Sequence, residues 1–116
     1  MSDVTIYHNP SCTTSRKVLA AIRATGVEPR VVEYLKTPPG RTELQSLLSH
    51  MEMTPRALLR RRGTPYDELE LDDPKLSDDS LIDAMLAHPI LIERPIVVTS
   101  RGVRLCRPVE KLTEIL

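Results

Sequence analysis

The apolar residues near the start of the chain form two short runs separated by a helical repeat. Residues 3–7 predict a buried strand, and residues 31–34 predict a second one. Between them, a helix is expected to begin at or just after Cys12 and to end at Gly26, with an apolar face formed by Val18, Leu19 and Ile22. A strand–helix–strand unit normally crosses right-handed, so the two strands are predicted to be parallel neighbours.

The middle of the chain carries helical spacing. The apolar positions within residues 44–51 recur every three or four residues, as on one face of a helix. Thr54-Pro55 is a capping residue followed by proline at the first helical position, and it is expected to open residues 56–62 as a helix. A further helix is predicted to begin at Ser77 and must stop before Pro89.

The last third of the chain predicts strands again. Residues 95–99 and 103–106 flank a turn that contains Gly102 and predict a hairpin, after which Pro108 begins a last short helix. The resulting order is strand–helix–strand, helices, then strand–strand–helix, which is the thioredoxin-like order. The predicted fold is therefore α/β, with a mixed four-stranded sheet and flanking helices.

The domain organisation follows from the same pattern. A chain of 116 residues suits one compact domain, so residues 1–116 are expected to form a single thioredoxin-like domain. Its helical insertion between the second and third strands is expected to cover approximately residues 36–90. The acidic stretch within residues 67–83 predicts a solvated surface.

Charge and cysteine usage narrow the classes of function. The 16 basic and 16 acidic residues cancel, so no nucleic-acid or membrane partner held by bulk electrostatics is expected. The N-terminus lacks a basic region followed by an apolar core, and no apolar run approaches the length of a membrane span. Cys12 and Cys106 lie far apart without metal-type spacing. We therefore expect a cytoplasmic protein with neither a structural disulfide nor a bound metal.

The strongest chemical signal is Cys12, at the junction of strand, turn and helix. A helix N-terminus offers unpaired backbone N–H groups and the positive end of the helix dipole. His8 precedes the turn formed by Asn9 and Pro10, and Arg16 lies one helical turn after the thiol. These features favour thiolate over thiol, and the thiolate is the reactive form. The sequence therefore predicts nucleophilic thiol chemistry at Cys12.

The roles of two residues near Cys12, and of the second cysteine, need separate consideration. His8 is either a turn residue bonded to backbone or a group that donates to, or charge-pairs with, the thiolate and lowers its pKa. Ser15, in the first helical turn, either bonds backbone or helps to position the sulfur. Cys106 ends a strand pattern, and a structural role is expected for it.

Other thiol and metal sites do not fit the spacing. A dithiol redox site requires a second cysteine at position 15, which is Ser15, and a low-molecular-weight phosphatase loop requires arginine at position 18, which is Val18. A cysteine protease needs a supported histidine, whereas His50 and His88 lie in helical segments. The sequence contains no metal-ligand cluster.

Three arginines from separate segments could converge on one anion. Arg94 precedes Pro95 at the start of a predicted strand, where thioredoxin-like proteins keep a cis proline facing the active-site cysteine. If that bond is cis, Arg94 is expected to project toward Cys12. Arg107 follows the second strand of the hairpin, and Arg60 lies within residues 56–62, where Arg61 and Arg62 could substitute for it. Guanidinium groups bind oxyanions in a bidentate manner.

These features together resemble the glutaredoxin-coupled arsenate reductases of the ArsC family. The similarity covers essentially the whole chain, and the order and spacing of its motifs make it specific. The segments that carry it are VTIYHNP at 4–10, TTSR after Cys12, TPP at 37–39, RALLR at 56–60, the segment 81–98 and LCRP at 105–108. One departure is Thr13, which stands where the family usually has glycine.

The resemblance implies a reaction and a set of site residues. The cysteine that matches Cys12 attacks arsenate, and His8 is counted with it as catalytic. The residues that match His8, Arg60, Arg94 and Arg107 hold the oxyanion or lower the pKa of the thiol. Independently of the resemblance, we assign Ser15 to the substrate-binding group with the three arginines. The resemblance further implies glutathione as co-substrate, glutaredoxin as protein partner and no bound cofactor. A monomer is expected.

Two other functions share this fold and stay open. A related thiol-disulfide or glutathione-handling protein without arsenate activity is the first, although such a protein does not need three placed arginines. A transcription regulator of the Spx kind is the second, but these regulators typically sense oxidation through Cys-x-x-Cys, which the chain lacks.

Overall fold

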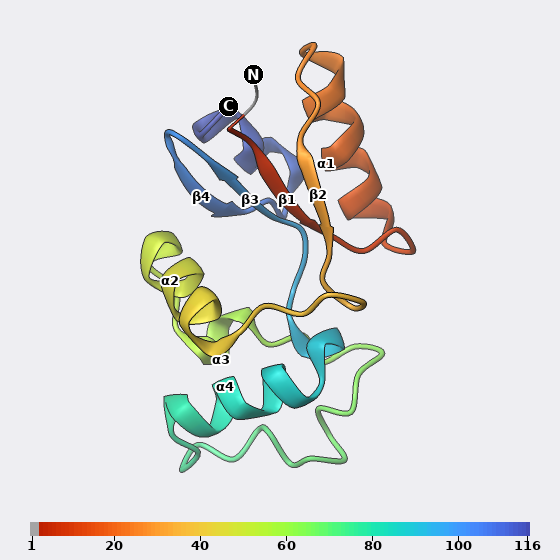
Figure 1. Cartoon of the computed structure of the whole chain (residues 1–116). Coiled ribbons are helices and arrows are strands. Elements are labelled where there is room, and N and C mark those ends of the chain that lie inside the picture. Colours follow the sequence, from red (N-terminus) through yellow and green to blue (C-terminus); the bar gives the residue numbers. More distant parts are fainter. Residues whose placement is uncertain (1–2) are drawn as a thin grey trace. The chain divides into compact units, whose positions relative to one another are not determined.

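The computed structural model describes residues 3–116, which form two compact units (Figure 1). Unit 1 combines the N-terminal segment up to Thr37 with the C-terminal segment from Arg94 to Leu116. Unit 2 is the continuous segment Pro38–Glu93. The predicted membership of both units in a single domain stays a prediction.

Unit 1 is built on a mixed four-stranded sheet. Its strands are β1 (Thr5–His8), β2 (Arg30–Glu33), β3 (Ile96–Thr99) and β4 (Gly102–Leu105), in the spatial order β2-β1-β3-β4. Strands β1 and β2 are parallel, whereas β3 is antiparallel to both β1 and β4. The helix α1 (Thr13–Ala24) connects the two parallel strands, as the strand–helix–strand pattern predicts. The predicted thioredoxin-like fold class is confirmed.

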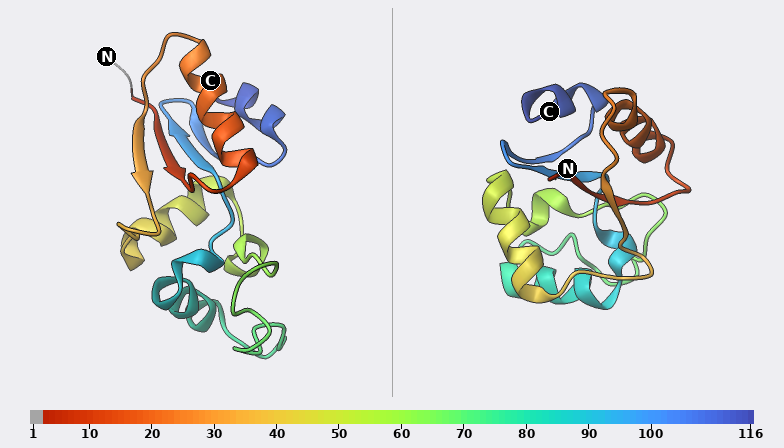
Figure 2. Two further views of the ribbon diagram at one scale, coloured as in Figure 1. Left: turned by 90° about the vertical axis from the view of Figure 1, so that its right-hand side faces the viewer. Right: turned by 45° about the horizontal axis from the view of Figure 1, so that its top comes forward.

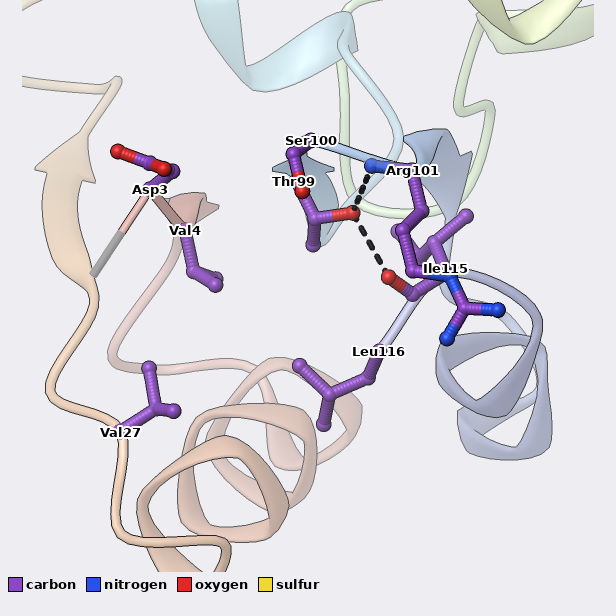
Figure 3. A pocket seen from close by; sticks show the side chains of 8 residues that line it. All are labelled: Asp3, Val4, Val27, Thr99, Ser100, Arg101, Ile115 and Leu116. Atoms are coloured by element: carbon purple, nitrogen blue, oxygen red, sulfur yellow. Dashed lines mark hydrogen bonds between the residues drawn. The ribbon is translucent and has the colours of Figure 1, made fainter. Parts of the chain in front are cut away.

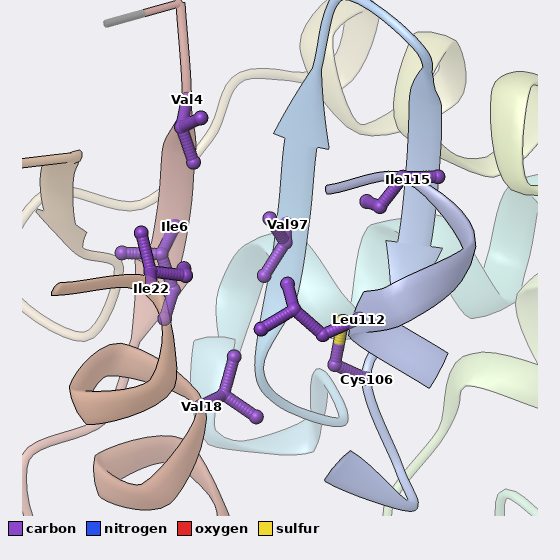
Figure 4. Close-up of a cluster of buried hydrophobic side chains, with 8 residues drawn as sticks. All are labelled: Val4, Ile6, Val18, Ile22, Val97, Cys106, Leu112 and Ile115. Carbon is purple, nitrogen blue, oxygen red and sulfur yellow. The ribbon is translucent and has the colours of Figure 1, made fainter. Parts of the chain in front are cut away.

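One face of this sheet is covered by α1 and by the short 3₁₀ helix η2 (Val109–Glu114), which lie side by side (Figure 2). Between helices and sheet, buried apolar side chains form one cluster (Figure 4), made up of Val4, Ile6, Val18, Ile22, Val97, Cys106, Leu112 and Ile115. Complete burial of one such aliphatic side chain stabilises the fold by roughly 1.5–3 kcal/mol. This cluster fixes α1 against β1 and so positions the turn that connects them.

Unit 2 is helical. It contains α2 (Arg41–Met51), α3 (Pro55–Leu58), α4 (Asp78–Ala87) and the 3₁₀ helix η1 (Pro89–Leu91), all of them between β2 and β3 in the chain. The side chain of Thr54 caps α3 and that of Ser77 caps α4, at the positions that the sequence predicts. The interior of the unit is aliphatic and includes Leu44, Leu48, Leu58, Leu81 and Met85.

The helix expected over residues 56–62 is shorter than predicted, since α3 ends at Leu58. The next residue, Leu59, is extended and forms an antiparallel bridge with Ile92. The backbone N–H of Arg60 donates to the carbonyl of Leu91 at 2.7 Å. Pairing with a segment more than thirty residues away thus overrides the local helical preference of RALLRRR.

Within residues 3–116, no helix combines the length and the apolar character needed to cross a bilayer. In the same residues, His, Cys, Asp and Glu side chains form no group of three that could hold a metal ion.

Candidate active site

Cys12 is the N-cap residue of α1, with an extended backbone at φ −94° and ψ 123°. Its N–H donates to the carbonyl of Asn9 at 3.0 Å, and its own carbonyl accepts the N–H of Arg16 at 3.0 Å. The side-chain oxygen of Asn9 also accepts the N–H of Ser11 at 2.9 Å. The turn and the start of the helix are therefore where the sequence predicts them, and the thiol lies at the helix N-terminus.

The sulfur of Cys12 is surrounded by hydrogen-bond donors. The Nη1 atom of Arg107 lies 3.7 Å from the sulfur. Burial raises the pKa of the Cys12 thiol, but the backbone N–H of Ser15 and the guanidinium groups of Arg94 and Arg107 more than offset this effect. The pKa of Cys12 consequently lies below its ordinary value, so the thiolate is favoured.

The two arginines near the sulfur also contact each other. Nη1 of Arg107 donates to the carbonyl oxygen of Arg94 at 3.0 Å, and Arg94 is buried. Both arginines precede a proline through a cis bond, at Arg94-Pro95 and at Arg107-Pro108. The structure thus brings Arg94 and Arg107 to Cys12. The Arg94-Pro95 bond is cis, which is the condition under which the sequence predicts that Arg94 projects toward Cys12.

His8 pairs with Ser15 rather than with the sulfur. Its Nδ1 atom lies 2.6 Å from the Ser15 Oγ, and its side chain is buried. Burial lowers the pKa of His8, the carboxylate of Glu33 opposes this and Arg23 adds to it, so the neutral imidazole is favoured. The imidazole of His8 therefore forms its contact with Ser15, and the structure does not show a direct charge pair with the Cys12 thiolate. The imidazole contacts the hydroxyl of Ser15, which lies in the first turn of α1.

Ser15 is fully buried, and its hydroxyl lies in the interior of the turn. The Oγ atom contacts His8 and also accepts the backbone N–H of Asn9 at 3.1 Å. Its backbone N–H is one of the groups that lower the pKa of Cys12. The hydroxyl therefore bonds backbone, which is the first of the two alternatives that the sequence leaves open, whereas of the groups of Ser15 only the backbone N–H acts on the sulfur. Its assignment to the substrate-binding group finds no support in this burial.

Asn9 contributes more contacts to the turn than its place in the sequence predicts. Its buried side chain and backbone contact Ser11, Cys12 and Ser15, although the sequence identifies it only as a turn-forming residue. The available signal was the preference of asparagine side chains to bond the backbone N–H two residues later.

Arg60 lies in unit 2, where its guanidinium is held by protein groups. Nη1 donates to Glu93 Oε1 at 3.0 Å, and Nε donates to the carbonyl of Arg62 at 3.0 Å. The neighbouring Arg61 is more exposed and pairs with Asp67, so it does not share this arrangement. The expected convergence of Arg60 with the other two arginines stays a prediction.

The surroundings of Cys106 and Thr13 differ in burial. Burial raises the pKa of Cys106 to about 12, and none of its side chain is exposed. The structural role predicted for this cysteine is therefore supported by its environment. Thr13 is exposed, and its hydroxyl accepts Nη2 of Arg16 at 3.4 Å, so its side chain points away from the interior of the turn.

A hollow of about 260 Å³ lies in unit 1 where β1 begins and β3 turns into β4 (Figure 3). Cys12 follows the opposite end of β1, and neither it nor Arg94 or Arg107 lines this hollow. The lining residues are Asp3, Val4, Val27, Thr99, Ser100, Arg101, Ile115 and Leu116. The Cys12 sulfur and the two guanidinium groups near it therefore lie outside the lining of this hollow.

Comparisons with known proteins find relatives over nearly the whole chain. The chain matches the model of the ArsC family over residues 7–115. It is 58% identical to an arsenate reductase of Rhizobium meliloti (strain 1021), over 97% of this chain and 81% of the relative. It is also 58% identical to an arsenate reductase of Escherichia coli (strain K12), over 100% of this chain and 82% of the relative. The solved structure of an arsenate reductase from Vibrio cholerae is 46% identical, with a TM-score of 0.94 over 99% of this chain and 98% of that one.

Proposed function

The chain belongs to the ArsC family, and we propose that it reduces arsenate to arsenite through a covalent intermediate on Cys12. The observation that carries this proposal is the sulfur at the N-terminus of α1, whose pKa is lowered by the Ser15 N–H, Arg94 and Arg107. A thiolate beside two guanidinium groups is suited to attack on a bound oxyanion.

Arsenate is a tetrahedral anion, and the groups around the sulfur match its charge. Arg94 and Arg107 would hold two of its oxygens, while N–H groups in the first turn of α1 add dipole and hydrogen-bond attraction. Arg60 is proposed as a third ligand on the basis of the family resemblance. In this scheme Ser15 and the neutral His8 support the sulfur from inside the turn, where their side chains bond each other at 2.6 Å.

The first chemical step forms a sulfur–arsenic bond. The Cys12 thiolate displaces one oxygen from As(V), and this oxygen leaves as water after protonation. The product is a thioarsenate on Cys12 in which arsenic is still pentavalent. Arg94 and Arg107 stabilise the negative charge that the remaining oxygens carry, before and after the displacement.

The two electrons must then come from thiols outside the chain. Position 15 is a serine, and Cys106 lies in the core with a raised pKa, so neither supplies a resolving thiol. We propose that glutathione attacks the adduct, which releases arsenite and leaves a mixed disulfide between glutathione and Cys12. Glutaredoxin then takes the glutathione from Cys12 by thiol–disulfide exchange and regenerates the thiol. This chemistry suits the reducing cytoplasm, and we propose that the protein acts there as a monomer.

A coupled assay tests the proposal. Arsenate-dependent oxidation of NADPH is measured with glutathione, glutaredoxin and glutathione reductase, and each component is omitted in turn. The expected result is turnover that needs arsenate, glutathione and glutaredoxin together. Absence of arsenate-dependent turnover in the intact protein, with reduction of mixed glutathione disulfides retained, would instead identify a thiol protein without arsenate activity.

A further inference from the structure

We propose that Asn9 is a positioning residue for the nucleophile: its side-chain amide fixes the turn so that the Cys12 sulfur faces the Ser15 N–H and the two guanidinium groups. The inference rests on the proposed function only in taking Cys12 as the nucleophile. Asn9 itself is not expected to touch the substrate.

The hydrogen bonds of Asn9 span the whole turn. Its side-chain Oδ1 accepts the N–H of Ser11 at 2.9 Å, and its backbone carbonyl accepts the N–H of Cys12 at 3.0 Å. Its backbone N–H donates to the Oγ of Ser15 at 3.1 Å. One residue therefore binds the residue before the nucleophile, the nucleophile itself and the residue whose N–H faces the sulfur.

The burial of Asn9 shows that its amide is committed to this turn. The residue is 4% exposed, whereas the adjacent Pro10 and Ser11 are exposed. A buried polar group is costly unless it is hydrogen-bonded, and the bond from Ser11 satisfies the amide oxygen. An alanine at this position offers no acceptor, so the N–H of Ser11 loses its partner inside the turn.

The consequence for the sulfur is geometric. Cys12 places its sulfur through an extended N-cap backbone, and the preceding residue is held by the Asn9 amide. When this bond is lost, the backbone at Ser11 samples more conformations. The sulfur then spends less time near its donors, and the thiol pKa is expected to rise toward its ordinary value.

We expect a neutral acceptor to serve this position best. An aspartate has nearly the same shape as asparagine and accepts the same N–H, but it adds a negative charge to the turn that leads to the thiolate. Like charges disfavour the ionised form of both groups. Asn9→Asp therefore separates the two requirements, since it keeps the turn and opposes the ionisation of Cys12.

The experiment is a titration of the thiolate by its ultraviolet absorbance in the wild type, Asn9→Ala, Asn9→Ser and Asn9→Asp. We expect Asn9→Ala to raise the thiol pKa by about 1 unit and to slow alkylation at neutral pH by about tenfold. Asn9→Ser should give a smaller rise, because a hydroxyl accepts the same bond more weakly. Asn9→Asp should raise the pKa at least as much as Asn9→Ala, while its melting temperature stays closer to that of the wild type.

Asp73→Ala is the matched control. The Oδ1 of Asp73 accepts the N–H of Lys75 at 2.9 Å, which is the same kind of turn in unit 2. We expect this variant to leave the thiol pKa unchanged.

An unchanged thiol pKa in folded Asn9→Ala, or in Asn9→Ser and Asn9→Asp if the alanine variant does not fold, would overturn the inference. An equal rise in Asp73→Ala would overturn it as well, since the effect would then not be local. The titration needs no arsenate, so a missing turnover in the wild type would contradict the proposed function and leave this test intact.

Discussion

The two cysteines of unit 1 show how one side chain acquires opposite properties. Burial raises the pKa of both thiols, and at Cys106 it raises the value to about 12. At Cys12 the Ser15 N–H and two guanidinium groups reverse the effect, whereas Cys106 lies among apolar side chains of the core. Partial burial therefore does not by itself prevent a reactive thiolate. The donors that surround the sulfur decide the outcome.

The largest expected difference between the two cysteines is in catalysis. Cys12→Ser should reduce arsenate turnover by at least about 10³-fold, because a hydroxyl at this position is not ionised and cannot form the thioarsenate. Cys106→Ala should keep kcat/KM within about twofold of the wild type, since its sulfur touches no reacting group. The coupled assay measures both values. Loss of turnover in a folded Cys106→Ala variant would show that the second sulfur takes part in the reduction.

The second difference is in reactivity without any substrate. In the native protein at neutral pH, iodoacetamide should label Cys12 at least about 100 times faster than Cys106, which is buried and holds its proton. Mass spectrometry of the labelled peptides measures the two rates. Addition of denaturant is the control, because unfolding should bring the rates within a few-fold of each other. Fast labelling of Cys106 in the native state would contradict its place in the core.

The contrast between these cysteines was largely predictable from the sequence, because it depends on local pattern. Cys12 follows a buried strand and a turn, and Cys106 ends the second strand of a hairpin. What the sequence could not give were contacts between distant segments. The end of α3 at Leu58 depends on pairing with Ile92, and the Glu93 partner of Arg60 lies on that same segment.

The roles of His8 and Ser15 show a second limit. Their spacing is compatible with either residue contacting the sulfur, and only the path of the turn decides. The structure directs the imidazole to the Ser15 hydroxyl and buries both side chains. Spacing along the chain identifies which residues lie near a helix N-terminus, but the direction of each side chain depends on the packing around the turn.

The third difference is in the dependence of stability on pH. Cys106 has a pKa of about 12 in the folded protein, compared with an ordinary value of 9.0. At a pH between these two values, the unfolded chain has released the thiol proton, whereas the folded protein still holds it. Stability is therefore lost as pH rises through this window, by about 1.4 kcal/mol between neutral pH and about pH 10. Cys12 has the opposite sign, because its lowered pKa gives a contribution that is present at alkaline pH and is lost as pH falls through the folded value.

Urea unfolding at neutral pH and at about pH 10 measures this difference. Cys106→Ala should cost about 1 kcal/mol at neutral pH through the lost side-chain contacts. The variant has no Cys106 thiol, so it should not show the loss of folding stability that this thiol causes at alkaline pH. The free energies of unfolding of the variant and the wild type should therefore become more nearly equal at high pH. A constant difference between them at both pH values would mean that Cys106 ionises in the folded protein as readily as in the unfolded chain.

The smallest effect, and the most direct test of what distinguishes the two sites, concerns, for each cysteine, one arginine that favours its ionisation. Arg107→Ala removes the guanidinium that lies 3.7 Å from the Cys12 sulfur and should raise the thiol pKa by about half a unit. Arg104→Ala is the matched control, because Arg104 lies in β4, two residues before Cys106, and pairs with Glu114. Its charge favours ionisation of Cys106, and the groups that lower the pKa of Cys12 are Ser15, Arg94 and Arg107. Loss of Arg104 should therefore leave the titration of Cys12 unchanged. Equal shifts of the Cys12 pKa in both variants would indicate a general effect of net charge, and the contacts around Cys12 would then not explain its ionisation.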